Sequence, residues 1–149
     1  MIPPFEISGQ LPPGAHQTRW DEFQERFGKT PWRRTLLWGM ERMLRSLKSV
    51  GCKRVFMDGS FVTSKEKPGD YDGCWDRGGM DLALLTKTDP VLLDFRNGRV
   101  AQKLKYGGEM FPADLVEAKS GRVFLESLSK DKDTGDPKGI VVIDLGDVT

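Results

Sequence analysis

Two aspartates separated by one residue are the groups in this sequence best placed to do chemistry. Asp70 and Asp72 end the stretch "GSFVTSKEKPGDYD", residues 59–72, with Tyr71 between them. Because alternate residues of a strand project from the same face, a strand here places both carboxylates on one side and Tyr71 on the other. Carboxylates held so close repel each other unless a cation neutralises them. Mg²⁺ is the usual cation, since it commonly takes one or two carboxylates together with substrate phosphates.

The beginning of the same stretch offers groups that could hold those phosphates. Gly59 and Ser60 follow the apolar run "RVFM", where we expect a strand to end and a short helix to begin. Backbone N–H groups at such a turn, with a nearby hydroxyl, form an anion-binding cradle. Lys65 and Lys67 lie between this turn and the aspartates and could neutralise a triphosphate as point charges. The structural alternative is a plain loop, because turns are usually rich in Gly, Pro and Asp.

Two helices are expected on the N-terminal side of this stretch. Thr18 is the expected N-cap of a short helix that ends at Gly28. Thr30 caps a second helix, which spans residues 31–50 and has Pro31 in its first turn. Apolar residues recur along the second helix at three- and four-residue steps and predict one buried face: Leu36, Leu37, Met40, Met43, Leu44, Leu47 and Val50.

Short apolar runs predict strands at residues 53–57, 70–75, 111–118 and 139–145. A loop-rich excursion with one or two short helices is expected over 77–108, and a helix over 122–130. This order of elements indicates an α+β fold, with a mixed sheet of about four strands and the N-terminal helices packed on it. Residues 1–17, rich in Pro and Gly, are expected to form an extended arm before a single domain over 18–149.

Composition excludes several classes of protein. The net charge of +1 gives no overall attraction to nucleic acid or membrane. Two cysteines and one histidine nearly exclude a Cys/His zinc site, which needs about four ligands. No apolar run approaches the roughly 20 residues of a membrane span, and no secretion signal is evident. We therefore expect a cytoplasmic protein with no membrane partner.

The spacing of the two motifs resembles the signature of the polymerase-β-like nucleotidyltransferase superfamily. Here the motifs read "GS" at 59–60 and "DYD" at 70–72, with nine residues between them, after an apolar strand. Gly73 stands where that superfamily usually has an apolar residue. Thr63, Lys65 and Pro68 resemble the small stand-alone, minimal nucleotidyltransferases, some of which belong to prokaryotic toxin–antitoxin and phage-defence modules. The resemblance implies the nucleotidyltransferase-like core and the transfer of a nucleoside monophosphate from an NTP.

The same resemblance implies a set of site residues. The nucleotide-binding residues it implies are Gly59, Ser60, Thr63 and Lys65. Asp70 and Asp72 are the expected ligands of two Mg²⁺ ions. A third carboxylate on a later strand completes such sites and helps to deprotonate the attacking hydroxyl. In this sequence "ADLV" matches that strand and makes Asp114 the expected third metal ligand and catalytic carboxylate, with Glu109 and Glu117 as weaker candidates.

A second hypothesis is non-enzymatic: a catalytically silent binding module of the same fold, such as an antitoxin or regulator. The small size favours it, since no separate acceptor-binding region is visible, whereas the intact Asp-x-Asp pair argues against it. A nucleotide is the expected partner, and RNA, a tRNA end or a partner protein are further candidates. Basic residues on the polar face of helix 31–50 could contact nucleic-acid phosphates, although such faces are usually just solvated. The sequence leaves the NTP, the acceptor and the oligomeric state open.

Overall fold

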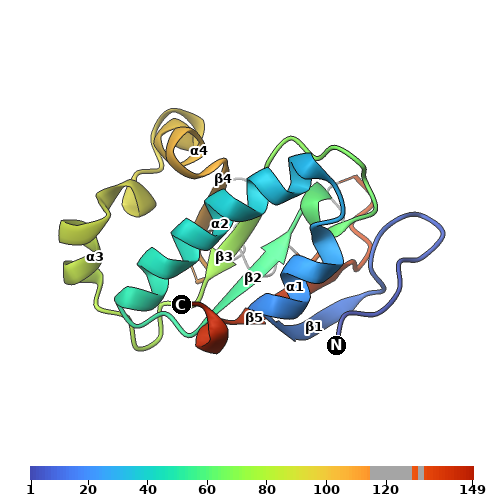
Figure 1. Ribbon diagram of the computed structural model, residues 1–149, viewed down its shortest axis with the longest axis horizontal. Coiled ribbons are helices and arrows are strands. Elements are labelled where there is room, and N and C mark those ends of the chain that lie inside the picture. The colour runs from blue at the N-terminus through green and yellow to red at the C-terminus, as the bar shows by residue number, and fades with distance from the viewer. Residues whose placement is uncertain (115–128, 131–132) are drawn as a thin grey trace.

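A five-stranded mixed sheet organises residues 1–114, 129–130 and 133–149, which the computed structural model describes (Figure 1). The strands are β1 Gly14–Arg19, β2 Arg54–Asp58, β3 Tyr71–Trp75, β4 Gly108–Pro112 and β5 Gly139–Asp144. Their order across the sheet is β1-β5-β2-β3-β4. The outer pairs, β1 with β5 and β3 with β4, run parallel, whereas β2 is antiparallel to both of its neighbours.

Two helices, α1 (Trp20–Phe27) and α2 (Pro31–Ser49), cover one face of the sheet and lie in front of it in Figure 1. The start of α2 is as the sequence predicts, because the Thr30 hydroxyl accepts a hydrogen bond from the Arg33 backbone N–H. Its predicted apolar face is buried in the main core, as Met40, Met43 and Leu47 illustrate. The sheet residues in the same core are Val55, Met57, Tyr71, Trp75, Met110, Val141 and Ile143.

Gly73 of β3 lies where the sheet leaves no room for a side chain. A Cβ there would meet the Phe56 carbonyl oxygen at 2.5 Å and the Met57 Sδ at 2.9 Å. Both distances are shorter than van der Waals contact, so any larger residue would displace the neighbouring strand. Packing therefore accounts for a glycine where the resembling superfamily usually has an apolar residue.

The N-terminal segment differs from the irregular arm expected over 1–17. Residues 14–19 form β1, an edge strand whose Gly14 to Arg19 pair in register with Gly139 to Asp144 of β5. Because Thr18 belongs to this strand, the N-cap of α1 is Arg19. The sequence "GAHQTR" is mostly polar and is a weak local signal for a strand. The strand forms because β5 offers a pairing partner, which local sequence does not reveal.

The first N–H groups of α1 are capped from the other end of the chain. The Asp147 carboxylate accepts hydrogen bonds from the Trp20 and Asp21 backbone N–H groups, both at 3.0 Å. Helix N-termini leave such donors without intrahelical partners, and a carboxylate there also interacts favourably with the helix dipole. The C-terminal turn thus stabilises the first helix.

The 77–108 excursion contains two short helices, α3 (Leu82–Thr88) and α4 (Val100–Tyr106), with 3-10 turns between them. α4 ends at Gly107 and β4 follows at once. Of the third predicted strand, 111–118, residues 115–118 lie outside the described residues. The observed strand β4 begins earlier, at Gly108, because pairing with β3 selects "GEMFP", and it ends before Asp114. Glycine, glutamate and proline are weak strand formers, which is why the local pattern favoured the later, more apolar run.

The fold class is confirmed at the level of an α+β domain with a mixed sheet and N-terminal helices on one face. The sheet has five strands rather than about four, since β1 joins it. Most of the helix predicted over 122–130 lies outside the described residues. Among the helices of the described residues, none has the length and apolarity needed to cross a membrane.

Candidate functional site

Three carboxylates lie in a row across neighbouring strands. Antiparallel pairing sets Asp58 of β2 opposite Asp72 of β3, and parallel pairing sets Glu109 of β4 on the other side of Asp72. Paired residues project from the same face of a sheet, and neighbouring strands are only about 4.8 Å apart. Tyr71 is buried in the core beneath the helices, so Asp72 projects from the opposite face, as the sequence predicts. We call Asp58, Asp72 and Glu109 the carboxylate row.

Gly59 brings the backbone against the middle of this row. Its φ of 78° lies in the left-handed region, which favours glycine. A Cβ at Gly59 would meet the Asp72 Oδ2 at 2.5 Å, so the position also needs a residue without a side chain. The two sequence motifs, separated along the chain, are thus in contact in space.

The surroundings of Asp72 make its anionic form costly. Burial is the largest cause, and the charges of Asp70 and Glu109 add to it, so the pKa of the Asp72 carboxyl rises from 3.8 to about 7. The Asp72 and Glu109 carboxyls also share a hydrogen bond. A proton or a metal cation would relieve this repulsion.

Basic side chains neutralise the two outer acids of the row. Lys138 Nζ lies 2.8 Å from Asp58 Oδ1, and both side chains are largely buried. Arg99 Nε lies 2.7 Å from Glu109 Oε2. Burial is the largest single influence on the pKa of Glu109 and by itself would raise it. The hydrogen bond and the charge of Arg99 together outweigh burial, so the pKa of Glu109 is lowered. Within the described part of the chain, Asp72 forms no ion pair.

Arg99 reaches Glu109 from a strained backbone. Asn97, Gly98 and Arg99 are successive residues with positive φ, at 52°, 66° and 60°. For an arginine this conformation costs about 1–2 kcal/mol and persists only where the surroundings hold it. Two Arg99 nitrogens donate to Glu109, and the guanidinium lies over the Phe111 ring, 5.2 Å from its centroid. These contacts hold the side chain in place over the carboxylate row.

A pocket of about 320 Å³ opens beside the Gly59-Ser60 turn. Thr63 and Lys138 also line it, and Gln10 contributes from the N-terminal segment. The short helix expected after the turn is a single 3-10 turn, Ser60–Val62. The pocket therefore lies where the turn, the last strand and the N-terminal segment meet.

A buried arginine fixes the loop that follows the turn. Arg33 of α2 is 4% exposed, and burial lowers the pKa of its guanidinium. The guanidinium donates hydrogen bonds to one backbone carbonyl oxygen at the end of α1 and to three in the loop that follows the turn: those of Phe27, Phe61, Thr63 and Lys65. Hydrogen bonds from a charged donor are stronger than neutral ones. α2 thus positions a loop that has little regular structure of its own.

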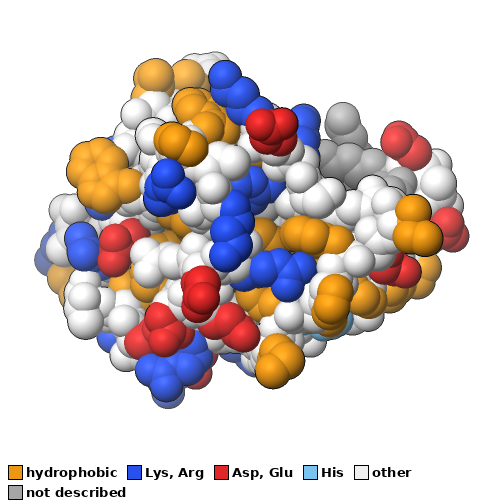
Figure 2. All heavy atoms as spheres, turned by 45° about the vertical axis from the view of Figure 1, so that its right-hand side comes forward, with side chains coloured by type: hydrophobic (Ala, Val, Ile, Leu, Met, Phe, Trp, Pro, Cys, Tyr) orange, Lys and Arg blue, Asp and Glu red, His pale blue; other side chains and the backbone are white. Residues whose placement is uncertain are grey.

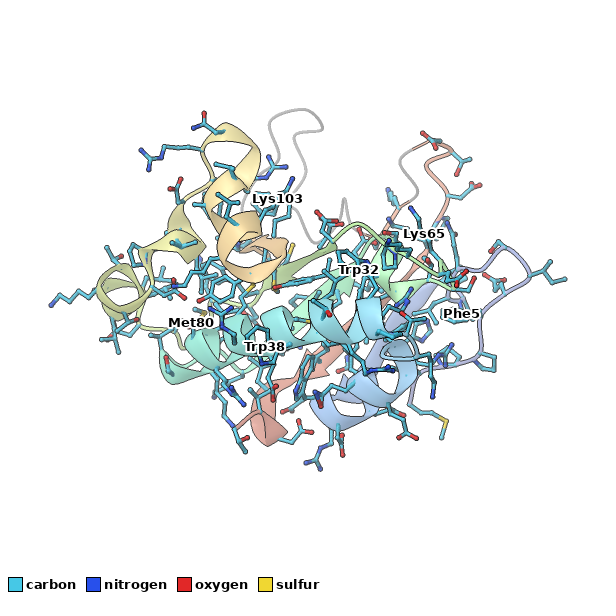
Figure 3. The ribbon with its side chains drawn as sticks, turned by 45° about the horizontal axis from the view of Figure 1, so that its top comes forward. Phe5, Trp32, Trp38, Lys65, Met80 and Lys103 are labelled. Atoms are coloured by element: carbon cyan, nitrogen blue, oxygen red, sulfur yellow. The ribbon has the colours of Figure 1, made fainter. Side chains whose placement is uncertain are left out.

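The other predicted nucleotide-binding residues have different surroundings. The Thr63 hydroxyl donates to the Ser60 carbonyl oxygen at 2.7 Å and accepts from the Lys65 N–H at 3.2 Å, so it stabilises the turn. The Lys65 side chain is exposed on the loop, whereas Lys103 extends from α4 on the other side of the structure in Figure 3. Lys103 Nζ lies 3.7 Å from Glu109, and Lys67 lies over the Trp32 ring.

The structure places Asp114, the predicted third carboxylate, away from Asp72. Asp114 follows the end of β4 and pairs with Arg77 at 2.7 Å, near the end of β3 distant from Asp72. Glu109, one of the weaker candidates, lies beside Asp72 instead. Glu117 lies outside the described residues. Both positions follow from that of the strand, since β4 begins earlier than the apolar pattern indicates.

The donor set fits a magnesium ion that shares its coordination with a substrate. Asp70 and Asp72 are hard oxygen donors, and burial together with the charge of Asp70 raises the pKa of Asp72. Mg²⁺ commonly uses one or two carboxylates plus phosphates. In the described ranges, no group of three or more His, Cys, Asp or Glu side chains is arranged to hold a metal. Glu109 is engaged by Arg99, so a third carboxylate is not ready to bind.

The basic face of α2 has structural contacts. Its cations donate to backbone carbonyl oxygens of the residue after α1, of α4 and of the C-terminal turn; they are Arg34, Arg42, Arg45 and Lys48. On the side of the molecule in Figure 2, basic and acidic side chains are interspersed with hydrophobic ones. These observations favour a structural role for this face over a nucleic-acid interface.

Four residues of the site were not assigned to it from the sequence: Arg33, Asp58, Arg99 and Lys138. Arg33 precedes Leu36 and Leu37 by three and four residues, and a cation in phase with an apolar face is a usable signal. Asn-Gly before Arg99 is a turn signal that predicts a positive φ nearby. Lys138 has no such local signal, because it meets Asp58 only through the pairing of β5 with β2.

Comparison with known proteins adds a family. A family model described as a family of unknown function (DUF6932) matches residues 3–144. No curated protein and no solved structure matches the chain. The match runs from before β1 to the end of β5 and includes the whole carboxylate row. The chain therefore belongs to the DUF6932 family.

Proposed function

We propose that this protein is a magnesium-dependent nucleotidyltransferase, which moves a nucleoside monophosphate from an NTP to a hydroxyl acceptor. The contact between the two motifs carries the proposal: Gly59 packs on Asp72, and Asp72 lies between Asp58 and Glu109. The motif spacing, its resemblance to polymerase-β-like nucleotidyltransferases and the mixed sheet support the same reaction. An RNA or tRNA end, a protein side chain or a small molecule could be the acceptor, in a toxin–antitoxin or phage-defence setting.

The pocket beside the Gly59-Ser60 turn is the proposed place of the nucleotide. Its volume of about 320 Å³ falls in the range of small-molecule sites, roughly 300–1,000 Å³. Ser60 offers a hydroxyl, and Lys138 lines the wall together with its ion-pair partner Asp58. Arg33 keeps this wall rigid by holding the loop carbonyls.

Transfer requires one bond to form and one to break. The acceptor oxygen bonds to the α-phosphorus, the bond from that phosphorus to the α,β-bridging oxygen breaks, and pyrophosphate leaves with the electron pair. Glu109, in place of Asp114, takes the proton of the attacking hydroxyl. Mg²⁺ held by Asp70 and Asp72 would supply the neutralisation of phosphate charge on which such reactions depend.

Labelled transfer tests this proposal. Wild type, Asp72→Asn and the control Asp114→Asn are incubated with Mg²⁺, each of the four α-labelled NTPs and a cell extract as the source of acceptor. We expect transfer by wild type and by Asp114→Asn, and a loss of roughly a thousandfold or more in Asp72→Asn. Transfer that Asp72→Asn leaves unchanged would place the active site elsewhere.

One observation favours the second candidate, a catalytically silent binding module. Arg99 and Lys138 neutralise two of the three acids of the carboxylate row without any metal. Such a module predicts no transfer by wild type with any of the four NTPs. Binding of its partner then survives Asp72→Asn.

A further inference from the structure

Arg99 is the cation that the proposed reaction must move. It occupies Glu109 with a short ion pair of 2.7 Å, and the Glu109 side chain is only 12% exposed. The Arg99 side chain is 33% exposed, so an incoming anion can reach it from solvent. Each Glu109 oxygen accepts a hydrogen bond from Arg99, so the carboxylate is a weaker base and a weaker metal ligand while this ion pair holds.

The backbone shows that this position is imposed on Arg99. Positive φ values at Asn97, Gly98 and Arg99 turn the chain sharply before α4 and bring the side chain over β4. Asparagine and glycine adopt this region readily, whereas arginine does so only when its contacts hold it. Nearby, Arg96 pairs with Asp94 and is far more exposed, at 84%, so it makes a matched comparison.

We propose, on the basis of the proposed function, that Arg99 is an exchangeable counter-ion: it neutralises Glu109 in the free protein and turns to the triphosphate when a divalent cation takes the carboxylates. Arginine suits both partners, because its planar group binds carboxylate and phosphate in the same two-pronged manner. Removing Arg99 frees Glu109 for the metal ion and therefore strengthens metal binding. It also removes a ligand of the phosphates and therefore weakens phosphate binding. Arg99 therefore makes divalent-cation binding depend on the nucleotide.

Arg99→Asn tests this exchange. Asparagine tolerates the left-handed backbone, so the variant removes the guanidinium with little change in chain conformation. Arg99→Gly has the same expectation and serves if Arg99→Asn does not fold, and Arg96→Gln is the control. The probes are Mn²⁺ alone, followed by electron paramagnetic resonance, and inorganic tripolyphosphate with Mn²⁺, followed by calorimetry.

We expect Arg99→Asn to bind Mn²⁺ alone about tenfold more tightly than wild type, and tripolyphosphate with Mn²⁺ about tenfold more weakly. Arg96→Gln should match wild type in both measurements. A merely structural role would weaken both affinities, and Mn²⁺ affinity that does not rise overturns the exchange.

If wild type transfers nucleotide but Arg99→Asn changes neither affinity, the exchange fails and the reaction stands. If the affinities shift as expected without any transfer, the exchange stands and the reaction fails, and a wild type that binds neither probe overturns both.

Discussion

Asp72 is the residue whose state depends most on its neighbours. It has an acid on each side in the sheet, and its own strand begins just after a third, Asp70. Its outer neighbours have basic partners, whereas Asp72 has no ion pair within the described residues. The Asp72 carboxyl therefore experiences most of the repulsion, which is relieved when it holds a proton or binds a cation.

The pH dependence of stability follows from this carboxyl. The pKa of Asp72 is 3.8 in the unfolded chain and about 7 in the folded protein. Between these pH values the native state therefore binds more protons than the unfolded state. The stabilisation is complete below the lower value and is lost as the pH rises through the upper one, by at most about 1.4 kcal/mol per pH unit. Urea unfolding between these pH values should show this decline in wild type and a flatter curve in Asp72→Asn. Glu109 acts with the opposite sign, at lower pH, because its folded pKa is lowered. Identical slopes for the two proteins would remove Asp72 as the cause.

Glu109 and Asp114 can be separated by one pair of variants. Glu109→Gln removes the acid beside Asp72 and should lower the transfer rate by roughly a thousandfold. Asp114→Asn removes an exposed acid paired with Arg77 and should leave the rate within about twofold, as surface ion pairs contribute little. Steady-state transfer rates measure both. The reverse ranking would restore Asp114 as the third carboxylate.

At the scale of elements, the site depends on how the turn after β2 is held. Gly59 supplies the backbone conformation, and Arg33 of α2 supplies hydrogen bonds to the loop. The hydrogen bonds that hold the loop come from α2 and not from the strands that carry the acids. The turn is thus attached to the helical layer on one side and to the carboxylate row on the other.

Gly59→Ala should disturb both stability and the site. Its Cβ would collide with Asp72 Oδ2 and would occupy a positive φ, which together predict a loss of about 1–3 kcal/mol in the free energy of unfolding. Gly69→Ala is the control, because nothing lies within 4 Å of a Cβ there. Chemical denaturation compares the two variants. Equal stability of both would show that Asp72 moves aside without cost.

Arg33→Met tests the loop clamp. Methionine keeps the apolar part of the side chain but leaves four carbonyl oxygens without their donor, so we expect a loss of about 2–4 kcal/mol. Hydrogen exchange should also accelerate at residues 61–65. Arg34→Met is the matched control, because Arg34 is exposed and, among the described residues, its guanidinium donates only to the Gly28 carbonyl oxygen. If Arg33→Met and Arg34→Met unfold at the same urea concentration, the clamp contributes nothing.

At the scale of the whole molecule, distant segments complete what local sequence begins. β1 pairs with β5, and Asp147 caps α1, so both ends of the chain stabilise the same corner of the fold. β5 also follows directly on Lys138, which neutralises Asp58. The carboxylate row therefore depends on segments drawn from most of the chain.

This dependence explains what could be predicted from the sequence. α2, β2, β3 and β5 have local periodicity and lie within a few residues of their predicted positions. The "GS" motif at Gly59 and the "DYD" motif at Asp72 can likewise be recognised from local sequence. The structure brings Gly59 and Asp72 close together. β1 and β4 are poor in strand formers, so only their partners define them. Because β4 could not be placed, Glu109 could not be preferred to Asp114.

A crystal structure with Mn²⁺ and a non-hydrolysable NTP analogue tests the central claim, that the carboxylate row is a metal-dependent nucleotide site. Mn²⁺ is chosen because its anomalous scattering identifies the ion. We predict an anomalous peak within about 2.5 Å of the Asp72 carboxylate, shared with Asp70 or Glu109, and the triphosphate beside Gly59 and Ser60. A peak beside Asp76 and Asp114 instead, or a bound nucleotide with no metal near Asp72, would contradict the claim.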